Sequence, residues 1–300
     1  MNMTRPCTLL ITPDDLMRRQ AAGERLMVFD CSFDLARPGA GLEQYHQAHI
    51  PGAVYAHLEH DLSDEGLVMP DGTRRPHPDA ASGGRHPLPS REKFAIWLSR
   101  VGFTNDMQAV VYDRQGANFC GRLWWMLKWA GHDAVAVLDG GWDGWQAAGG
   151  SVRGGDEPAR FQSNFSLGPP LRELVTTAQV QARLGSAAQT LVDARAPARY
   201  RGEVEPLDPV AGHIPGARNR PFNQNLGTDG RFKPADVLRV EFGQLLEGRP
   251  AGSVVHQCGS GVSAIPNLIA MEIAGLGATA LYAGSWSEWC RDPSRPVERG

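Results

Sequence analysis

The sequence predicts an α/β protein with two tandem copies of one domain, each a mainly parallel sheet with helices on both faces. Three observations predict this fold. Segments of the first half recur in the same order in the second half, short β-branched runs alternate with helix-like segments, and 300 residues are enough to bury two cores. Strands that alternate with helices form parallel sheets through right-handed crossovers, which cover both faces.

The repeat consists of four kinds of segment: a strand ending in Asp, a His-Ile-Pro-Gly-Ala turn, a second buried strand and a Trp-rich turn. They lie at 28–30, 49–53, 110–113 and 140–145 in the first half, and at 191–193, 213–217, 254–257 and 284–289 in the second. Trp142 and Trp286 are 144 positions apart, as are Val111 and Val255, so the last two pairs match without a gap. Such a match indicates duplication of a domain.

Local patterns indicate the elements within each copy. In the first copy, apolar residues at near-helical spacing precede the strand-like run 134–138; they are Phe119, Leu123, Leu127 and Ala130. In the second copy, the apolar run 253–257 precedes a predicted buried helix, marked by Leu268, Ile269, Met271 and Ile273. A polar segment that contains Gly and Pro is the expected connector. We therefore expect domains at 1–150 and 171–300, joined by a linker at 151–170.

Composition excludes several classes of function. The formal net charge is −3, from 30 basic and 33 acidic residues. This charge does not favour binding to a nucleic acid or to an anionic membrane surface. The five cysteines form no Cys-x-x-Cys pair, so neither a disulfide framework nor a zinc site is expected. The N-terminus lacks the zones of a signal peptide, and polar residues and glycines interrupt the apolar segment 264–282. We expect a cytoplasmic protein in a reducing compartment, with no metal and no organic cofactor.

Cys258 is the candidate nucleophile. It ends the apolar run 253–257 and opens the loop Cys-Gly-Ser-Gly-Val-Ser-Ala, beyond which the predicted buried helix begins. A strand, a glycine loop and a helix would hold the sulfur among backbone N–H donors, and the partial positive charge of those donors favours the nucleophilic thiolate. At the offset of 144, Arg114 takes the corresponding position in the first copy. Only the second copy can therefore perform thiolate chemistry.

The tandem pattern and the loop 258–264 resemble the two-domain sulfurtransferases of the rhodanese superfamily, and most of all the 3-mercaptopyruvate sulfurtransferases. The resemblance runs from about Thr12 to Trp289. In that family the loop typically reads Cys-Gly-Ser-Gly-Val-Thr-Ala, and Ser263 keeps the hydroxyl of the usual threonine. Thiosulfate-preferring members carry two cations within the loop, which suit a compact dianion, whereas the neutral loop of this chain suits mercaptopyruvate. A phosphatase would need an arginine where Ala264 stands.

The resemblance also implies roles for individual residues. Cys258 would be the nucleophile, and Ser260 would relay a proton, oriented by His86 of the segment Gly-Arg-His-Pro-Leu-Pro and in turn by Glu59, with Asp61 as an alternative. Arg199 would clamp the substrate carboxylate. The remaining loop residues would bind the substrate and the persulfide; they are Gly259, Gly261, Val262 and Ser263. A second substrate arginine is expected where Leu207 stands in this chain, and three others could replace it: Arg201, Arg218 and Arg220.

The function that the resemblance implies is transfer of sulfur from 3-mercaptopyruvate, through a persulfide on Cys258, to a thiol or cyanide, with release of pyruvate. The expected partners are a small-molecule sulfur donor and a thiol acceptor, which could be a thioredoxin-like protein. Two alternatives stay open. One is a thiosulfate:cyanide sulfurtransferase, and the other is a rhodanese-like module that binds a partner without catalysis, which the presence of Cys258 disfavours.

Overall fold

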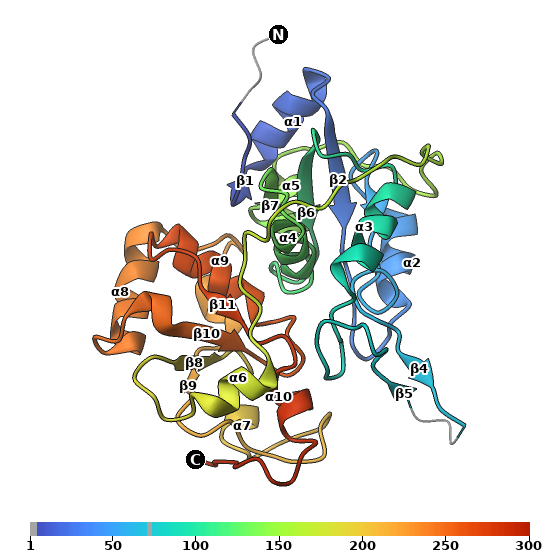
Figure 1. Cartoon of the computed structure of the whole chain (residues 1–300). Helices are drawn as coiled ribbons and strands as arrows, with labels where there is room; N and C mark the ends of the chain where they lie inside the picture. The colour runs from blue at the N-terminus through green and yellow to red at the C-terminus, as the bar shows by residue number, and fades with distance from the viewer. Residues whose placement is uncertain (1–4, 71–73) are drawn as a thin grey trace. The chain divides into compact units, whose positions relative to one another are not determined.

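The computed structural model describes residues 5–70 and 74–300, and these form two compact units (Figure 1). Unit 1 contains the described residues of Met1–Leu62 together with Arg91–Leu171 and Leu226–Phe232. Unit 2 contains Ser63–Ser90, Arg172–Asn225 and Lys233–Gly300, each as far as it is described. The predicted boundaries at 150 and 171 stay a prediction.

Unit 1 has a five-stranded parallel sheet in the order β1-β7-β6-β2-β3. The strands are β1 (Leu10–Ile11), β2 (Leu26–Asp30), β3 (Val54–Tyr55), β6 (Gln108–Tyr112) and β7 (Val135–Leu138). The helices of the unit are α1 (Pro13–Ala21), α2 (Ala40–Gln47), α3 (Arg91–Arg100), α4 (Cys120–Trp129) and α5 (Gly141–Ala147). The central strand β6 is buried along its whole length, as expected for a parallel sheet covered by helices.

Unit 2 has a four-stranded parallel sheet in the order β11-β10-β8-β9. The strands are β8 (Thr190–Asp193), β9 (Arg218–Asn219), β10 (Val254–Gln257) and β11 (Ala280–Leu281). The α-helices are α6 (Thr177–Ala182), α7 (Pro197–Tyr200), α8 (Ala235–Leu246), α9 (Ile265–Ile273) and α10 (Ser285–Trp289), and the 3₁₀ helices are η1 (Phe222–Asn225) and η2 (Ala251–Ser253). The two parallel sheets confirm the predicted α/β fold.

The duplication is visible in the order of the strands. In unit 1 the strand order β7-β6-β2-β3 corresponds to β11-β10-β8-β9 in unit 2, although the register of β8 against β10 differs by one residue from that of β2 against β6. The tryptophans of the two matching turns are all buried: Trp142, Trp145, Trp286 and Trp289. Strand order and core therefore repeat along with the sequence motifs.

Each unit contains a segment from the other half of the sequence. Ser63–Ser90 follows β3 in the first half but belongs to unit 2, where β4 (Leu67–Val68) and β5 (Arg74–Arg75) pair as an antiparallel hairpin. Leu226–Phe232 follows β9 in the second half but belongs to unit 1. The first of these exchanged segments matters for the site, because it carries His86 into the unit that holds Cys258.

No helix in the described part of the chain is long and apolar enough to cross a bilayer. Nor do three or more His, Cys, Asp or Glu side chains, among the residues placed by the structure, gather where they could hold a metal ion.

Candidate active site

Cys258 follows β10 directly and begins the loop that leads into α9. The residue is only 2% exposed. Its backbone is fixed by the first turn of α10: the N–H of Cys258 donates to Oγ of Ser285 at 3.1 Å, and its carbonyl accepts from the N–H of Trp286 at 3.0 Å. The end of the strand and the start of α10 together determine where the sulfur lies.

A close approach of the chain at Ala283 requires glycine at position 261. Gly261 has a φ of 75°, in the left-handed region, and a Cβ atom there would lie 2.2 Å from the carbonyl oxygen of Ala283. After the loop, Pro266 stands in the first turn of α9, where a missing N–H costs no intrahelical hydrogen bond. The loop is therefore a tight turn that leads directly into the N-terminus of α9.

Several N–H groups of this loop have no acceptor. Within the residues that the structure describes, the N–H groups of Gly259, Ser260, Val262 and Ser263 donate to no carbonyl and no side chain. Buried N–H groups are normally paired, and an unpaired one costs free energy. Successive N–H donors next to a helix N-terminus attract negative charge. The loop is suited to hold an anion.

The corresponding loop of unit 1 binds such an anion from within the chain. Asp113 follows β6 at the position that Gln257 holds in unit 2, and its carboxylate accepts four N–H bonds from its own loop. The donors are Gln115 at 2.9 Å, Ala117 at 3.0 Å, Phe119 at 2.8 Å and Cys120 at 2.9 Å. At the offset of 144 they match positions 259, 261, 263 and 264. We call this set of N–H groups the amide cradle; in unit 1 it is filled by a carboxylate.

The two loops share a conformation but differ in charge. Ala117 has a φ of 64°, close to that of Gly261. Burial raises the pKa of Asp113, and the N–H bonds from the loop oppose that rise. Gln257 in unit 2 is neutral, and neither polar atom of its carboxamide has a partner among the described residues. Unit 2 therefore contributes no carboxylate of its own at this position, and the N–H groups of Gly259 and Ser263, which match two of the donors in unit 1, can bind an external anion.

The structure brings Ser260 and His86 together. Nδ1 of His86 lies 2.8 Å from Oγ of Ser260, and both residues are buried, at 3% and 6% exposure. His86 comes from the exchanged segment Ser63–Ser90, which is 174 positions away in sequence. A hydroxyl paired with an imidazole in a buried setting can pass a proton in either direction, depending on the tautomer.

Two guanidinium groups flank the second residue of the loop. A Cβ atom on Gly259 would lie 3.1 Å from Nη2 of Arg85 and 3.4 Å from Nη1 of Arg199. Asp208 bridges them, since its carboxylate accepts from Arg85 at 2.7 Å and from Arg199 at 3.2 Å. Glu205 also pairs with Arg199, at 2.7 Å. Burial raises the pKa of Asp208, and the charge of Arg85 opposes that rise.

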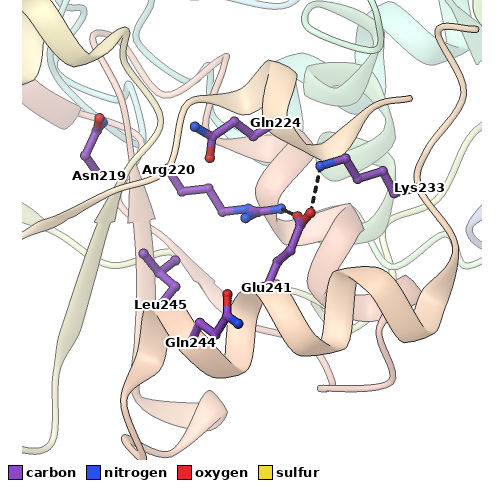
Figure 2. A pocket seen from close by; sticks show the side chains of 7 residues that line it. All are labelled: Asn219, Arg220, Gln224, Lys233, Glu241, Gln244 and Leu245. Carbon is purple, nitrogen blue, oxygen red and sulfur yellow. Dashed lines mark hydrogen bonds and ion pairs between the residues drawn. The ribbon is translucent and has the colours of Figure 1, made fainter. Parts of the chain in front are cut away.

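Sequence reasoning missed Arg85, although it stands directly before His86. The three arginines considered for the second substrate contact are engaged elsewhere. Arg201 pairs with Glu203 near the surface; Arg218 pairs with Glu247 at 2.8 Å and with the carbonyl of Leu245. Arg220 donates to Glu241 at 2.8 Å and lines a hollow of about 380 Å³ between β9, η1 and α8, where Lys233 holds the other oxygen of that carboxylate (Figure 2). No residue of the Cys258 loop lines that hollow.

A buried guanidinium stacks on the first tryptophan of the turn in both units. In unit 2, Arg195 lies 4.8 Å from the ring of Trp286 and pairs with Asp193 at 2.7 Å. In unit 1, the guanidinium is that of Arg114, 4.5 Å from the ring of Trp142 and 3.0 Å from Asp30. Burial opposes the charge of Arg195, but its pKa is raised by the carboxylates of Asp193 and Glu205 and by the sulfur of Cys258. Arg195 therefore places a fixed positive charge near the candidate nucleophile.

Glu59 and Asp61, the two predicted acidic partners of His86, lie in unit 1. The N–H of Glu59 donates to Nδ1 of His57 at 3.1 Å, and the carboxylate of Asp61 accepts from the N–H of His57 at 2.8 Å. Burial raises the pKa of Asp61. The part of either residue in orienting His86 stays a prediction.

Comparisons with known proteins identify the family. A family model described as "Rhodanese-like domain" matches residues 12–148 and 176–292. A probable 3-mercaptopyruvate sulfurtransferase of Pseudomonas aeruginosa is 45% identical over 97% of this chain and 98% of its own length. A putative thiosulfate sulfurtransferase of Mycobacterium tuberculosis is 39% identical, with 97% of both chains covered. The crystal structure of a 3-mercaptopyruvate sulfurtransferase from Escherichia coli superposes with a TM-score of 0.76 at 28% identity, over 94% of this chain and all of that chain.

Proposed function

The chain belongs to the rhodanese family of sulfurtransferases, and we propose that it moves a sulfur atom from 3-mercaptopyruvate to a thiol or cyanide through a persulfide on Cys258. The single observation that carries the proposal is that the loop after Cys258 has four N–H groups without an acceptor among the described residues, those of Gly259, Ser260, Val262 and Ser263. Where unit 1 fills its cradle with the carboxylate of Asp113, unit 2 has a neutral Gln257 and a cysteine at the mouth of the loop. Such a cradle stabilises a thiolate, and then the charged persulfide that replaces it.

In the first half-reaction, the thiolate of Cys258 attacks the sulfur of 3-mercaptopyruvate. The new S–S bond takes the electron pair of the thiolate, and the pair of the breaking C–S bond moves onto the pyruvate carbon as an enolate. The enolate needs one proton to become pyruvate. Ser260 is the proposed donor, recharged by His86, whose ring nitrogen is 2.8 Å from the hydroxyl oxygen. Glu59 is the proposed orienter of His86.

The substrate carboxylate would lie between Arg85 and Arg199. Both guanidinium groups reach the edge of Gly259, next to the nucleophile. A guanidinium recognises a planar carboxylate through two parallel hydrogen bonds, so two of them fix both the position and the orientation of the donor. The loop amides, at Gly259, Gly261, Val262 and Ser263, then face the transferred sulfur.

In the second half-reaction, an acceptor thiolate or cyanide attacks the outer sulfur of the persulfide, and Cys258 leaves as a thiolate. We propose a small thiol or a thioredoxin-like protein as the physiological acceptor. A cytoplasmic location is proposed with it, and is supported by five cysteines that are all free, as expected in a reducing compartment.

Thiosulfate is the second candidate donor. It is favoured by the two guanidinium groups beside Gly259, which would also suit a compact dianion, and by the name of the relative that is 39% identical. Steady-state kinetics separate the candidates, because the proposal predicts a higher kcat/KM for 3-mercaptopyruvate. A higher value for thiosulfate would reverse the choice of donor.

Mass spectrometry of the intact protein tests the chemistry itself. Incubation with the donor should add the mass of one sulfur atom, and a thiol should remove it. Cys258→Ser should take up no sulfur from any donor and keep the circular dichroism of the wild type. Sulfur uptake by this variant would show that the nucleophile lies elsewhere.

A further inference from the structure

We infer that Ser287 and Glu288 are positioning residues that dock the exchanged segment onto α10 and thereby place Arg85 and His86 at the Cys258 loop. The inference rests on the proposed function, since it assigns these residues to the proton relay and the carboxylate clamp of that site. Nothing in the sequence motif alone indicates this role, because the turn that contains both residues reads as part of the core repeat.

The contacts are made through the backbone of the segment. Oγ of Ser287 accepts the N–H of Arg85 at 2.9 Å, and the carboxylate of Glu288 accepts the N–H of Gly83 at 3.1 Å. Ser287 is 1% exposed, so its hydroxyl is shielded from competing water. Two neighbouring residues of α10 thus hold two N–H groups that lie two residues apart, just before His86.

The segment also approaches α10 too closely for side chains. Gly84 has a φ of 89°, and a Cβ atom there would lie 2.6 Å from the carbonyl oxygen of Gly284 and 2.8 Å from Oγ of Ser287. A Cβ atom on Gly83 would lie 2.7 Å from Cδ of Glu288. Glycines at both positions let the backbone of the segment pack directly on the start of α10.

The same turn of α10 holds the nucleophile loop. The N–H of Ser287 donates to the carbonyl of Gly259 at 2.9 Å, and the N–H of Trp286 donates to that of Cys258 at 3.0 Å. Ser287 therefore binds the loop through its backbone and the exchanged segment through its side chain. One residue sets the distance between the two parts that the Ser260–His86 pair must bridge.

The duplication supplies an internal control. In the first copy the turn reads Gly-Gly-Trp-Asp-Gly-Trp, and in the second Gly-Ser-Trp-Ser-Glu-Trp, so the tryptophans are kept while Asp143 and Gly144 stand in place of Ser287 and Glu288. Asp143 is exposed, and Gly144 has no side chain to act as an acceptor. The pair of acceptors occurs only in the copy that carries the cysteine.

Unit 1 holds its own exchanged segment by other means. There the N–H of Phe232 donates to Asp139 at 3.0 Å, and Leu226 lies against the loop, with Cδ1 only 2.6 Å from where a Cβ on Gly116 would be. The corresponding loop is thus covered by an apolar side chain where unit 2 receives a histidine. The two acceptors on α10 therefore occur only in the copy that has the catalytic residues, and they are not a general feature of the fold.

The test compares Ser287→Ala/Glu288→Ala with the conservative pair Ser287→Thr/Glu288→Gln, which keeps an acceptor oxygen at both positions. In the first variant, hydrogen exchange of the amides at 83–88 should accelerate about ten-fold or more, kcat should fall about ten-fold, and KM for 3-mercaptopyruvate should rise several-fold, as expected for two lost hydrogen bonds. The conservative variant should recover most of each loss. Asp143→Ala, the matched change in the first copy, should change none of them.

Unchanged exchange at 83–88 and unchanged kinetics in the double alanine variant would overturn the inference. If that variant does not fold by circular dichroism, Ser287→Ala alone serves as the second measurement, because it removes one hydroxyl, and the same direction of change in exchange and KM is expected. Failure of the proposed function is separate: it would appear as sulfur transfer by Cys258→Ser, while exchange at 83–88 reports docking whether or not the enzyme turns over.

Discussion

Gln257→Asp should switch off sulfur transfer by giving unit 2 the internal anion that unit 1 already has. Asp113 shows that a carboxylate at this position accepts four N–H bonds from its own loop. Loss of a single oxyanion donor costs about 10²–10³-fold in turnover. Because the introduced carboxylate would occupy several donors and add a negative charge beside the thiolate of Cys258, we expect kcat/KM to fall by at least about 10³-fold.

The fold should survive this change. Hydrogen bonds to a charged group contribute about 1.5–3 kcal/mol each, and burial of the carboxylate costs several kcal/mol, so the two effects offset one another. We expect the free energy of unfolding in urea to stay within about 2 kcal/mol of the wild type. The expected effect comes from the charge of the introduced carboxylate. Gln257→Asn, whose side chain has the shape of Asp without the charge, is the matched control.

The assays are steady-state pyruvate release and sulfur uptake measured by intact mass. Gln257→Asn should keep sulfur uptake, whereas Gln257→Asp should lose it. A Gln257→Asp enzyme with near wild-type turnover would refute the reasoning. Either the carboxylate would not bind the N–H groups of the loop, or the transferred sulfur would not need them. Equal losses in both variants would instead assign the effect to side-chain length.

Three other changes should have measurable effects. His86→Ala should lower kcat about 10²-fold, and adding Ser260→Ala should cost little more, because the two act as one relay; additive losses in the kinetics would contradict this. Arg85→Ala should raise KM for 3-mercaptopyruvate about ten-fold through loss of charge-assisted hydrogen bonds, and an unchanged KM would remove it from the clamp. Arg114→Ala should lower the free energy of unfolding by about 3–5 kcal/mol, measured in urea, because it leaves the buried carboxylate of Asp30 without its cation.

The sequence predicted those features that depend on local pattern. Strands around Val111 and Val255 were predictable because each is an apolar run at the same place in both copies, and the helix after the loop was predictable from its apolar residues. The pairing of Ser260 with His86 followed from family resemblance, and the structure places the two side chains 2.8 Å apart. No local pattern could have indicated that pairing, since the residues are 174 positions apart.

Arg85 was missed for a physical reason. Its guanidinium reaches Gly259 because the segment Ser63–Ser90, although it belongs to the first half of the sequence, packs in unit 2. The sequence suggested arginines near Leu207 instead, where the family normally has one. Proximity in sequence does not show which charges are already neutralised, and the guanidinium of Arg220 is paired with Glu241.

The difference between Asp113 and Gln257 was visible in the sequence, but its meaning was not. A strand that ends in Asp is common, and side chains at such positions often bond the following turn. Only coordinates show that this carboxylate accepts four N–H groups. They also show that two of the matching donors, the N–H groups of Gly259 and Ser263, have no acceptor among the described residues. The internal repeat therefore allows a direct comparison of two loops. In unit 1 the loop N–H groups bind the carboxylate of Asp113, and in unit 2 the neutral Gln257 stands at the same position.

The buried guanidinium explains why position 258 is free to hold cysteine. Both units need a cation between the strand-end carboxylate and the tryptophan ring, and unit 2 supplies it from Arg195, two residues after Asp193. Unit 1 has Ser32 at the corresponding place, so its loop must supply the cation from Arg114, at the very position of the nucleophile. Arg114→Cys alone would therefore leave a carboxylate unpaired and a cradle still filled. A working thiol in unit 1 requires the cation to return to position 32 and the anion to leave position 113.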